Sequence, residues 1–459
     1  MYQIDFSHPI HIYFIGIGGI SMSGLAEILL ESNFRISGSD AKESPLTKAL
    51  IEKGATIHYG QSAEHITKNI DLVVYTAAIK KDNPEMEEVS KQRIPLLTRA
   101  ELLGQIMKTY QTPIAISGTH GKTTTTSMVS EILLQADTDP TLSIGGILKA
   151  IKGNFRLGKS GYFVTEACEY TNSFLSFFPK ISIILNIEED HMDFFKDITE
   201  IRNSFHQFAL LLPEDGTLII NGDIPNVAEI TNNLSCKVIT FGINQSSDYS
   251  ASDICYDELA RPSFKLLHGP NFIDTITLGV PGKHNVYNAL AAIALADTLG
   301  ITASLTKSAL HTFSGTERRF EYKGNIGGVT IIDDYAHHPT EITATLTAAK
   351  NYPHKTTWCV FQPHTFTRTK AFLIDFAKAL SIADKIVLAD IYAARETDNL
   401  GISSKNLQSE IQKLGKDCYY FPSFDEIENF LLENCINGDL LITMGAGDVV
   451  KIGESLLGK

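Results

Sequence analysis

The sequence predicts an α/β protein of three domains, and three observations carry this prediction. The chain has 459 residues, which at roughly 150 residues per domain corresponds to about three domains. Short β-branched apolar runs alternate with helical stretches, a pattern typical of parallel sheets covered by helices. This alternation restarts near Pro113 and again near Gly328. We therefore place the domains at residues 1–108, 109–318 and 319–459.

The first unit is expected to contain strands at residues 10–18, 34–38, 55–59 and 71–77 and to end with a helix at residues 98–108. A glycine cluster, Gly16-Ile17-Gly18-Gly19, separates the first strand from a helix, and Asp40 ends the next strand. Such glycines let the backbone approach a pyrophosphate, while the acid meets a ribose hydroxyl. Because Ser21 stands where the third glycine belongs, the pattern suits any nucleoside diphosphate. We predict a Rossmann-like domain.

The second unit is expected to contain strands at residues 113–117, 162–166, 181–187, 216–222 and 237–242 and an alanine-rich helix at residues 284–299. The segment SGTHGKTT, residues 117–124, lies between a strand and a helix, as a phosphate-binding loop must. Lys122 would reach the terminal phosphates, and Thr123 would hold Mg²⁺. The loop is short, because Ile116 occupies the usual first glycine position. We predict a P-loop ATPase-like domain with a mostly parallel sheet.

Two polar clusters follow neighbouring strands of this unit. Glu166 begins the segment EACE, and His191 ends the segment NIEEDH. Because the carboxyl ends of parallel strands open on one crevice, both clusters are expected beside the phosphate loop. Glu166 and His191 could provide ligands for one or two Mg²⁺ ions. Either cluster alone is more typical of a solvated strand end, and their joint position after strands of this unit favours the metal site.

The third unit is expected to be Rossmann-like, with strands at residues 328–335, 356–362, 385–390 and 439–445. Four further polar clusters lie at the ends of elements, at residues 282–288, 315–321, 333–339 and 361–368. Each alone is typical of a capped helix, a linker or a turn. Together they indicate a binding site.

Composition excludes several classes of protein. The chain carries 39 basic and 53 acidic residues, a formal charge of −14, which disfavours a general nucleic-acid binder or a polybasic membrane attachment. Six scattered cysteines show no metal-type spacing and indicate reduced thiols. The N-terminal segment lacks the basic region and the cleavage site of a secretory leader, so we expect none, and no apolar run is long enough to span a bilayer. We therefore expect a cytoplasmic protein without membrane insertion.

Together, the motifs of the chain resemble those of the Mur ligases of bacterial peptidoglycan synthesis. The resemblance covers essentially the whole chain and rests on nine motifs in the family's order: GIGGISMSG, SGTHGKTTTT, EACE, NIEEDHMD, GKHNVYN, GTERRFE, DDYAHHPTE, FQPHTFTRT and MGAGD. It implies an enzyme whose first domain holds the UDP part of a sugar nucleotide, whose second binds ATP, and whose third receives an amino acid. The implied cofactors are ATP and Mg²⁺, and the implied substrates are UDP-N-acetylmuramate and L-alanine. A monomer or a weak homodimer is expected.

The resemblance also implies roles for individual residues. Those facing UDP are Gly18, Gly19 and Asp40. Those binding ATP are Gly118, Thr119, His120, Gly121, Lys122, Thr123, Thr124, His284, Asn285, Asn288, Arg319 and Asp334. Those serving Mg²⁺ are Thr123, Glu166 and His191, and those around the amino acid are Tyr335, His364 and Arg368. Those expected in catalysis are Lys122, His191, Arg319 and His337.

Two positions depart from the family's pattern. Thr365 stands where many members have an arginine, which leaves Arg368 to hold the amino-acid carboxylate with less help. Several related ligases use a carbamylated lysine after the DHMD segment, but the comparable region here contains His206 and no lysine. We therefore expect no carbamate.

The chemistry that fits is activation of a carboxylate by ATP. The lactyl carboxylate would attack the γ-phosphate, and the alanine amine would then displace phosphate from the acyl phosphate. A recycling ligase of the same family, which attaches a tripeptide to the same sugar nucleotide, is the nearest alternative. An NAD-dependent oxidoreductase leaves the phosphate loop unexplained, and a nucleotide-controlled binding module leaves the Mg²⁺ and amino-acid clusters without a purpose.

Overall fold

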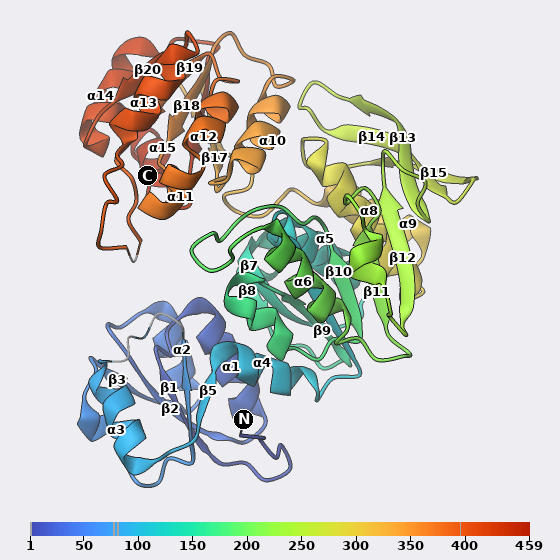
Figure 1. Ribbon diagram of the computed structural model, residues 1–459, viewed down its shortest axis with the longest axis vertical. Helices are drawn as coiled ribbons and strands as arrows, with labels where there is room; N and C mark the ends of the chain where they lie inside the picture. The colour runs from blue at the N-terminus through green and yellow to red at the C-terminus, as the bar shows by residue number, and fades with distance from the viewer. Residues whose placement is uncertain (1, 77–78, 80–81, 395) are drawn as a thin grey trace.

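The computed structural model describes residues 2–76, 79, 82–394 and 396–459. Its chain forms three α/β units in sequence, each with one sheet, and the second unit lies between the other two (Figure 1). The predicted α/β class with three domains is confirmed, whereas the residue bounds of the domains stay a prediction. Ala77, the end of the strand expected at 71–77, lies outside the described residues.

The first sheet has five parallel strands in the order β3-β2-β1-β4-β5. Its strands are β1 (His11–Ile15), β2 (Arg35–Asp40), β3 (Thr56–Tyr59), β4 (Leu72–Tyr75) and β5 (Leu96–Thr98). Its helices are α1 (Ile20–Glu31), α2 (Pro45–Glu52), the 3-10 turn η1 (Ala63–His65), α3 (Pro84–Gln92) and α4 (Arg99–Met107). The strand order reverses at β1, so the crevice at its carboxyl end is where such sheets bind ligands. The glycine cluster lies there.

The second sheet has ten strands in the order β15-β14-β13-β12-β11-β10-β6-β9-β7-β8. They are β6 (Thr112–Ser117), β7 (Thr141–Leu148), β8 (Gly153–Arg156), β9 (Tyr162–Glu166), β10 (Ile181–Ile184), β11 (Thr217–Asn221), β12 (Lys237–Gly242), β13 (Tyr249–Tyr256), β14 (Pro262–His268) and β15 (Asn271–Thr277). The helices are α5 (Lys122–Gln135), η2 (Lys149–Ile151), η3 (Tyr170–Ser176), α6 (Ile198–Ala209), α7 (Ala228–Thr231), α8 (His284–Thr298) and α9 (Ala303–Thr312). Central strands such as β10 and β11 are rich in isoleucine and buried throughout, as expected for a sheet covered on both faces.

The edges of this sheet differ from the sequence prediction. Strands β13, β14 and β15 form an antiparallel extension at one edge, and β8 pairs antiparallel with β7 at the other. None of these five strands is in the predicted set. Their burial is partial, so the continuous apolar runs that identify central strands are missing from them.

The third sheet has six strands in the order β16-β17-β21-β18-β19-β20, with only β16 antiparallel to its neighbour. They are β16 (Glu321–Ile326), β17 (Val329–Asp334), β18 (Thr357–Phe361), β19 (Lys385–Leu388), β20 (Asp417–Tyr420) and β21 (Leu440–Met444). The helices are α10 (Pro339–Ala349), α11 (Phe366–Ala371), α12 (Leu373–Leu380), α13 (Ser404–Lys413), α14 (Phe424–Asn434) and α15 (Val450–Leu456).

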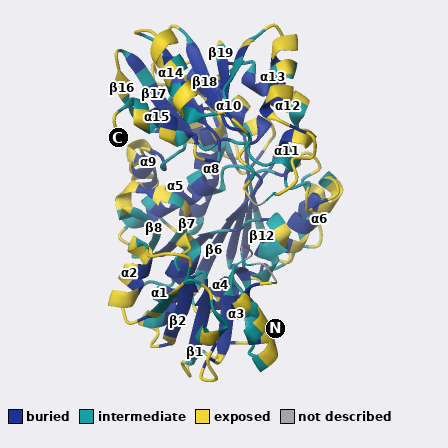
Figure 2. Cartoon of the chain, turned by 90° about the vertical axis from the view of Figure 1, so that its left-hand side faces the viewer, coloured by how far each residue is buried: buried dark blue, intermediate teal, exposed yellow. Residues whose placement is uncertain are grey.

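The units pack against one another in two different ways. One apolar cluster runs from the first sheet into the second unit, where Phe155 packs against it. A Cβ at Gly24 would lie 2.5 Å from the Phe155 ring, and one at Gly104 would lie 1.9 Å from the Ser176 carbonyl oxygen. The two apolar clusters around the third sheet contain residues of that unit alone. Figure 2 shows central strands such as β1, β6 and β18 as buried and the outer helix faces as exposed.

In the part of the chain that the structure describes, no helix combines the length and the apolar character that crossing a bilayer requires.

Candidate active site

The glycine-rich turn at Gly118–Gly121 connects β6 to α5. Gly121 precedes α5 with φ +84°, a left-handed conformation that favours glycine, and no side chain caps this helix. The first-turn N–H groups and the helix dipole therefore face the turn, which suits an anion. A Cβ at Gly121 would lie 2.6 Å from Oδ1 of Asn288, so the turn packs directly on α8.

The Lys122 ammonium is held among oxygens at this turn. It donates to the carbonyl oxygens of Gly118 and Thr119 at 2.5 and 3.0 Å, and it pairs with the Glu169 carboxylate at 3.0 Å. The Glu169 side chain is only 2% exposed. Although burial opposes a positive charge, Glu169 raises the pKa of Lys122, which therefore stays cationic.

The predicted Mg²⁺ ligands come together beside this lysine. The Thr123 hydroxyl donates to Oε2 of Glu166 at 3.1 Å, and the backbone N–H of Gly145 donates to Oε1. Strand β9, which ends at Glu166, and strand β10 both pair with β6, as the crevice argument predicts. His191 follows β10, and its Nε2 lies 3.9 Å from Glu169. Burial lowers the pKa of His191, so its imidazole is neutral at neutral pH.

From the third unit, Glu341 on α10 reaches the phosphate loop. Its Oε1 lies 3.2 Å from Nδ1 of His120 and 4.0 Å from Arg319, and its Oε2 accepts the backbone N–H of His337 at 3.1 Å. Burial opposes protonation of His120, but Glu188 and Glu341 outweigh it and raise its pKa to about 9. Burial lowers the pKa of His337 to about 4. The loop histidine is thus cationic and His337 is neutral.

Asp334 lies at the end of β17 and is 6% exposed. It accepts the backbone N–H groups of Ala336 and Phe320 and the hydroxyl of Thr345. Burial raises its pKa to about 6, although Arg319 acts in the opposite direction. In the structure this carboxylate organises the turn that carries Tyr335 and His337.

A second ion pair joins the second and third units. The Arg368 guanidinium donates to Oδ1 of Asp190 at 3.0 Å, and both side chains are at most 10% exposed. Nδ1 of His364 lies 3.1 Å from Arg368 Nη1. Coulombic attraction by Arg368 overcomes the burial of Asp190 and lowers its pKa. Tyr335 stacks beneath Arg319, with the guanidinium 5.1 Å from its ring centroid.

A cavity of about 870 Å³ opens among all three units. Arg99 lines it from the first unit, Cys168 and His191 line it from the second, and His364 and Arg368 line it from the third. The phosphate loop is not part of its lining, but Lys122 lies next to it through Glu169, the neighbour of Cys168. The cavity therefore places groups from three domains around one space.

The residues expected to face UDP lie at the crevice of the first sheet, outside the lining of this cavity. Oδ2 of Asp40 accepts the backbone N–H of Gly18 at 2.8 Å, so Asp40 holds the glycine turn itself. Arg99, at the start of α4, donates to Ser21 Oγ at 2.9 Å and points a guanidinium into the same region.

The segment expected to contact adenine packs against the phosphate loop, since a Cβ at Gly121 would meet Asn288. Asn285 and Asn288 are buried and hydrogen-bonded to each other at 2.9 Å, while His284 at the helix start is exposed. The structure also brings in charged groups that the sequence prediction did not include, namely Arg99, Glu169, Asp190 and Glu341. Glu169 and Asp190 stand inside the quoted motifs EACE and NIEEDH, but nothing in the sequence shows which cation each one meets.

Three α/β units, a lysine-bearing phosphate loop and a cavity between the units together define a class of protein, the nucleotide-dependent multidomain enzymes. Three family models match the chain in order: "Mur ligase family, catalytic domain" over residues 11–111, "Mur ligase middle domain" over 116–296, and "Mur ligase, glutamate ligase domain" over 318–447. The chain belongs to the Mur ligase family.

Two curated relatives and two solved structures illustrate the similarity. UDP-N-acetylmuramate–L-alanine ligases of Lachnospira eligens and Agathobacter rectalis are 62% and 61% identical to the chain, and each match covers 100% of both proteins. The crystal structure of the UDP-N-acetylmuramate-alanine ligase of Thermotoga maritima matches with a TM-score of 0.81 at 29% identity, over 98% of each chain. A murein peptide ligase from Psychrobacter arcticus matches with a TM-score of 0.70 at 26% identity, also over 98% of each chain.

Proposed function

We propose that this protein joins L-alanine to the lactyl carboxylate of UDP-N-acetylmuramate at the expense of ATP, as a step in peptidoglycan synthesis. The observation that carries the proposal is the cavity shared by three units, with the lysine-bearing phosphate loop next to it. The full-length identity of about 60% to ligases named for this reaction supports the choice of substrates.

The proposed reaction has two chemical steps. An oxygen of the lactyl carboxylate attacks the γ-phosphorus of ATP, the bond to the β-phosphate oxygen breaks, and ADP and an acyl phosphate form. The alanine amine attacks the acyl carbon, inorganic phosphate leaves, and the nitrogen loses one proton. Lys122 and Arg319 stabilise the charge that develops on the transferring phosphoryl group.

Glu166, Thr123 and His191 form the proposed Mg²⁺ site. Carboxylate and hydroxyl oxygens are donors that Mg²⁺ prefers, and the two lie 3.1 Å apart. The ion, when bound, neutralises phosphate charge. A Cβ at Gly145 would lie 2.6 Å from the Glu166 carboxylate, so this backbone closes one side of the group and holds it in place.

A neutral histidine can accept the proton from the amine. Nδ1 of His337 lies 3.0 Å from the Tyr335 carbonyl oxygen, and donation there leaves Nε2 with a free lone pair. Its lowered pKa keeps it unprotonated at neutral pH. His191 is a second candidate with the same neutral state. On the other side of the amino acid, Arg368 and His364 are proposed to hold its carboxylate, with Tyr335 beside them.

We place the remaining groups by the same reasoning. Gly18, Gly19 and Asp40 are proposed to receive the UDP moiety, and Arg99 adds a cation at the cavity wall. Asn285 and Asn288 are proposed to support the nucleotide site from beneath the loop. All six cysteines are unpaired thiols, which supports a cytoplasmic location for the reaction.

Phosphate release, measured with UDP-N-acetylmuramate, ATP and one amino acid at a time, tests the proposal. Turnover with L-alanine above that with glycine or serine is expected. A murein tripeptide serves as the competing arm, because the similarity to a murein peptide ligase extends over the whole chain. Turnover with the tripeptide and none with L-alanine would replace this proposal by the recycling reaction.

A further inference from the structure

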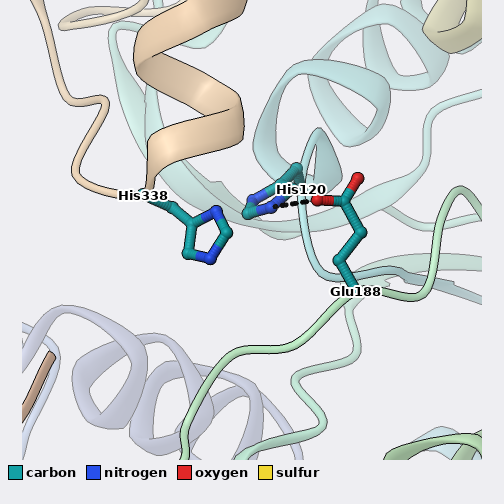
Figure 3. A group of neighbouring side chains, drawn as sticks. All are labelled: His120, Glu188 and His338. Atoms are coloured by element: carbon teal, nitrogen blue, oxygen red, sulfur yellow. Dashed lines mark ion pairs between the residues drawn. The ribbon is translucent and has the colours of Figure 1, made fainter. Parts of the chain in front are cut away.

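Two histidines and a glutamate meet where the third unit contacts the phosphate loop. His120 comes from the loop, Glu188 follows β10, and His338 precedes α10 (Figure 3). One potential ligand atom from each side chain lies within 4.8 Å of the other two. None of the three is among the predicted Mg²⁺ ligands.

Each imidazole has one nitrogen held by an oxygen of a neighbouring segment, and its other nitrogen is free in His120 and weakly bonded in His338. Nδ1 of His120 lies 3.2 Å from Oε1 of Glu341, while its buried Nε2 has no hydrogen-bond partner, although the Glu188 carboxylate is 3.5 Å away. Nε2 of His338 lies 3.0 Å from the Glu189 carbonyl oxygen. Histidines that ligate metals commonly donate their second N–H to a carboxylate or carbonyl in this way.

The other nitrogen of His338, Nδ1, accepts the backbone N–H of Thr340 at 3.3 Å and so caps α10; a metal ion would replace this long hydrogen bond. In Figure 3 the His338 ring turns one nitrogen toward His120, and the Glu188 carboxylate stands on the other side of His120. His338 is 4% exposed, and the Glu188 side chain is 37% exposed. The group is therefore sheltered by protein on one side and open to solvent at Glu188.

The surrounding contacts hold two of these side chains in place. The Asn186 side chain accepts the backbone N–H of His120 at 2.7 Å and donates to its carbonyl oxygen at 3.0 Å. The backbone N–H of Glu188 donates to the Thr119 hydroxyl at 2.9 Å. Two carboxylates, Glu188 and Glu341, surround the imidazoles, so the local charge suits a dication once His120 is deprotonated.

We propose that His120, Glu188 and His338 form a site for one transition-metal ion of the zinc class, which ties the third unit to the phosphate loop. Two imidazoles and one carboxylate are a common zinc ligand set with a fourth position for water, and they disfavour Mg²⁺, which takes oxygen ligands. Tetrahedral ligands at about 2.1 Å from zinc lie about 3.4 Å apart. The 3.5 Å between Nε2 of His120 and Oε2 of Glu188 is close to this spacing, and the His338 ligand atom, which lies within 4.8 Å of both, has to approach by at most roughly 1.4 Å.

Cobalt(II) titration of the chelator-treated full-length chain, without nucleotide or sugar substrate, tests the site. One equivalent is expected to bind and to give the absorption of a tetrahedral ion. His338→Asn and Glu188→Gln are expected to weaken binding at least tenfold. Asparagine is a good N-cap, so His338→Asn keeps the start of α10 intact. The matched control is His311→Asn, an exposed histidine in the last turn of α9.

The outcomes separate clearly. Loss of the cobalt signal in both variants, with retention in the His311→Asn control and in excess Mg²⁺, supports the site. An unchanged signal in His338→Asn, no binding by the parent chain, or displacement by Mg²⁺ would each overturn the proposal. Hydrogen exchange gives a second readout: Zn²⁺ should slow exchange at residues 338–342 in the parent chain, and equal exchange with and without Zn²⁺ would count against the tie between units. Neither measurement depends on the proposed ligase reaction.

Discussion

Replacing Lys122 by alanine is expected to have two separable effects. It removes the cation proposed to act on the transferring phosphate, and it leaves Glu169 buried without its closest positive partner. Glu169 is 2% exposed and has two oxygens at 3.0 and 3.3 Å from the Lys122 ammonium. His191 also lies near Glu169, but it is 3.9 Å away and its imidazole is neutral.

The magnitudes follow from this geometry. Breaking a buried ion pair by removing one partner costs about 3–5 kcal/mol, because the remaining charge is uncompensated. Removing both partners avoids that cost, so Lys122→Ala/Glu169→Ala should recover most of the lost stability. Phosphoryl transfer should fall on the order of 10³-fold in both variants, which corresponds to about 4 kcal/mol in the barrier.

Urea unfolding, phosphate release and calorimetry of UDP-N-acetylmuramate binding, applied to the same preparations, separate these effects. The single variant should unfold at lower urea and bind the sugar nucleotide normally, and the double variant should unfold near the parent midpoint while remaining inactive. Lys159→Ala, an exposed lysine in the same unit, is the control. Equal loss of phosphate release and sugar binding would refute the assignment of the two ligands to separate domains. A double variant as unstable as the single one would refute the ion-pair argument.

Three further predictions address other parts of the molecule. We expect nucleotide and UDP-sugar together to compact the parent chain in small-angle scattering. Arg368→Ala removes the cation paired with Asp190 across the second and third units, so this compaction should weaken in the variant, and unchanged compaction would contradict a closing role of the pair. Asp334 binds its proton more tightly in the folded protein than in the unfolded chain. The free energy of unfolding of the parent chain should therefore fall by about 2–3 kcal/mol relative to Asp334→Asn as the pH rises from about 4 to about 6. Urea unfolding measures this difference, and parallel pH profiles of the two proteins would contradict the prediction. Gly104→Ala should lower unfolding stability by more than about 2 kcal/mol, because its Cβ meets a backbone carbonyl. Gly153→Ala should be nearly neutral in the same urea unfolding, because its Cβ would make only an ordinary contact, 3.8 Å, with the Ile151 carbonyl oxygen.

The sequence predicts the central strands well because their signal is local. In β10 the residues Ile181–Ile184 are buried throughout, and such a run between turn residues reads as a covered parallel strand. The antiparallel strands β13–β15 have no such run, since β15 buries only Ile276 fully and exposes Phe272 and Ile273. Their pairing depends on register between segments, which composition does not specify.

The site shows the same division between local and distant information. The phosphate loop follows from eight consecutive residues and a strand–turn–helix context. The ion pairs around the loop do not follow from the sequence, because they join residues that are far apart in it. Lys122 meets Glu169 over 47 residues, Arg368 meets Asp190 over 178, and His120 meets Glu341 over 221. A motif indicates which residue types gather at the site, but only the packing of the units decides which carboxylate faces which cation.

The two inter-unit contacts differ in a way that bears on catalysis. The first unit meets the second through apolar packing and two glycine contacts, at Gly24 and Gly104, which separate only by exposing apolar surface to water. The third unit meets the second through Arg368–Asp190 and His120–Glu341, pairs whose partners water can solvate when they part. Movement between units therefore belongs at the junction of the second and third. The proposed amino-acid site could then open and close over the proposed acyl phosphate, while the proposed sugar-nucleotide site stays fixed relative to the second unit.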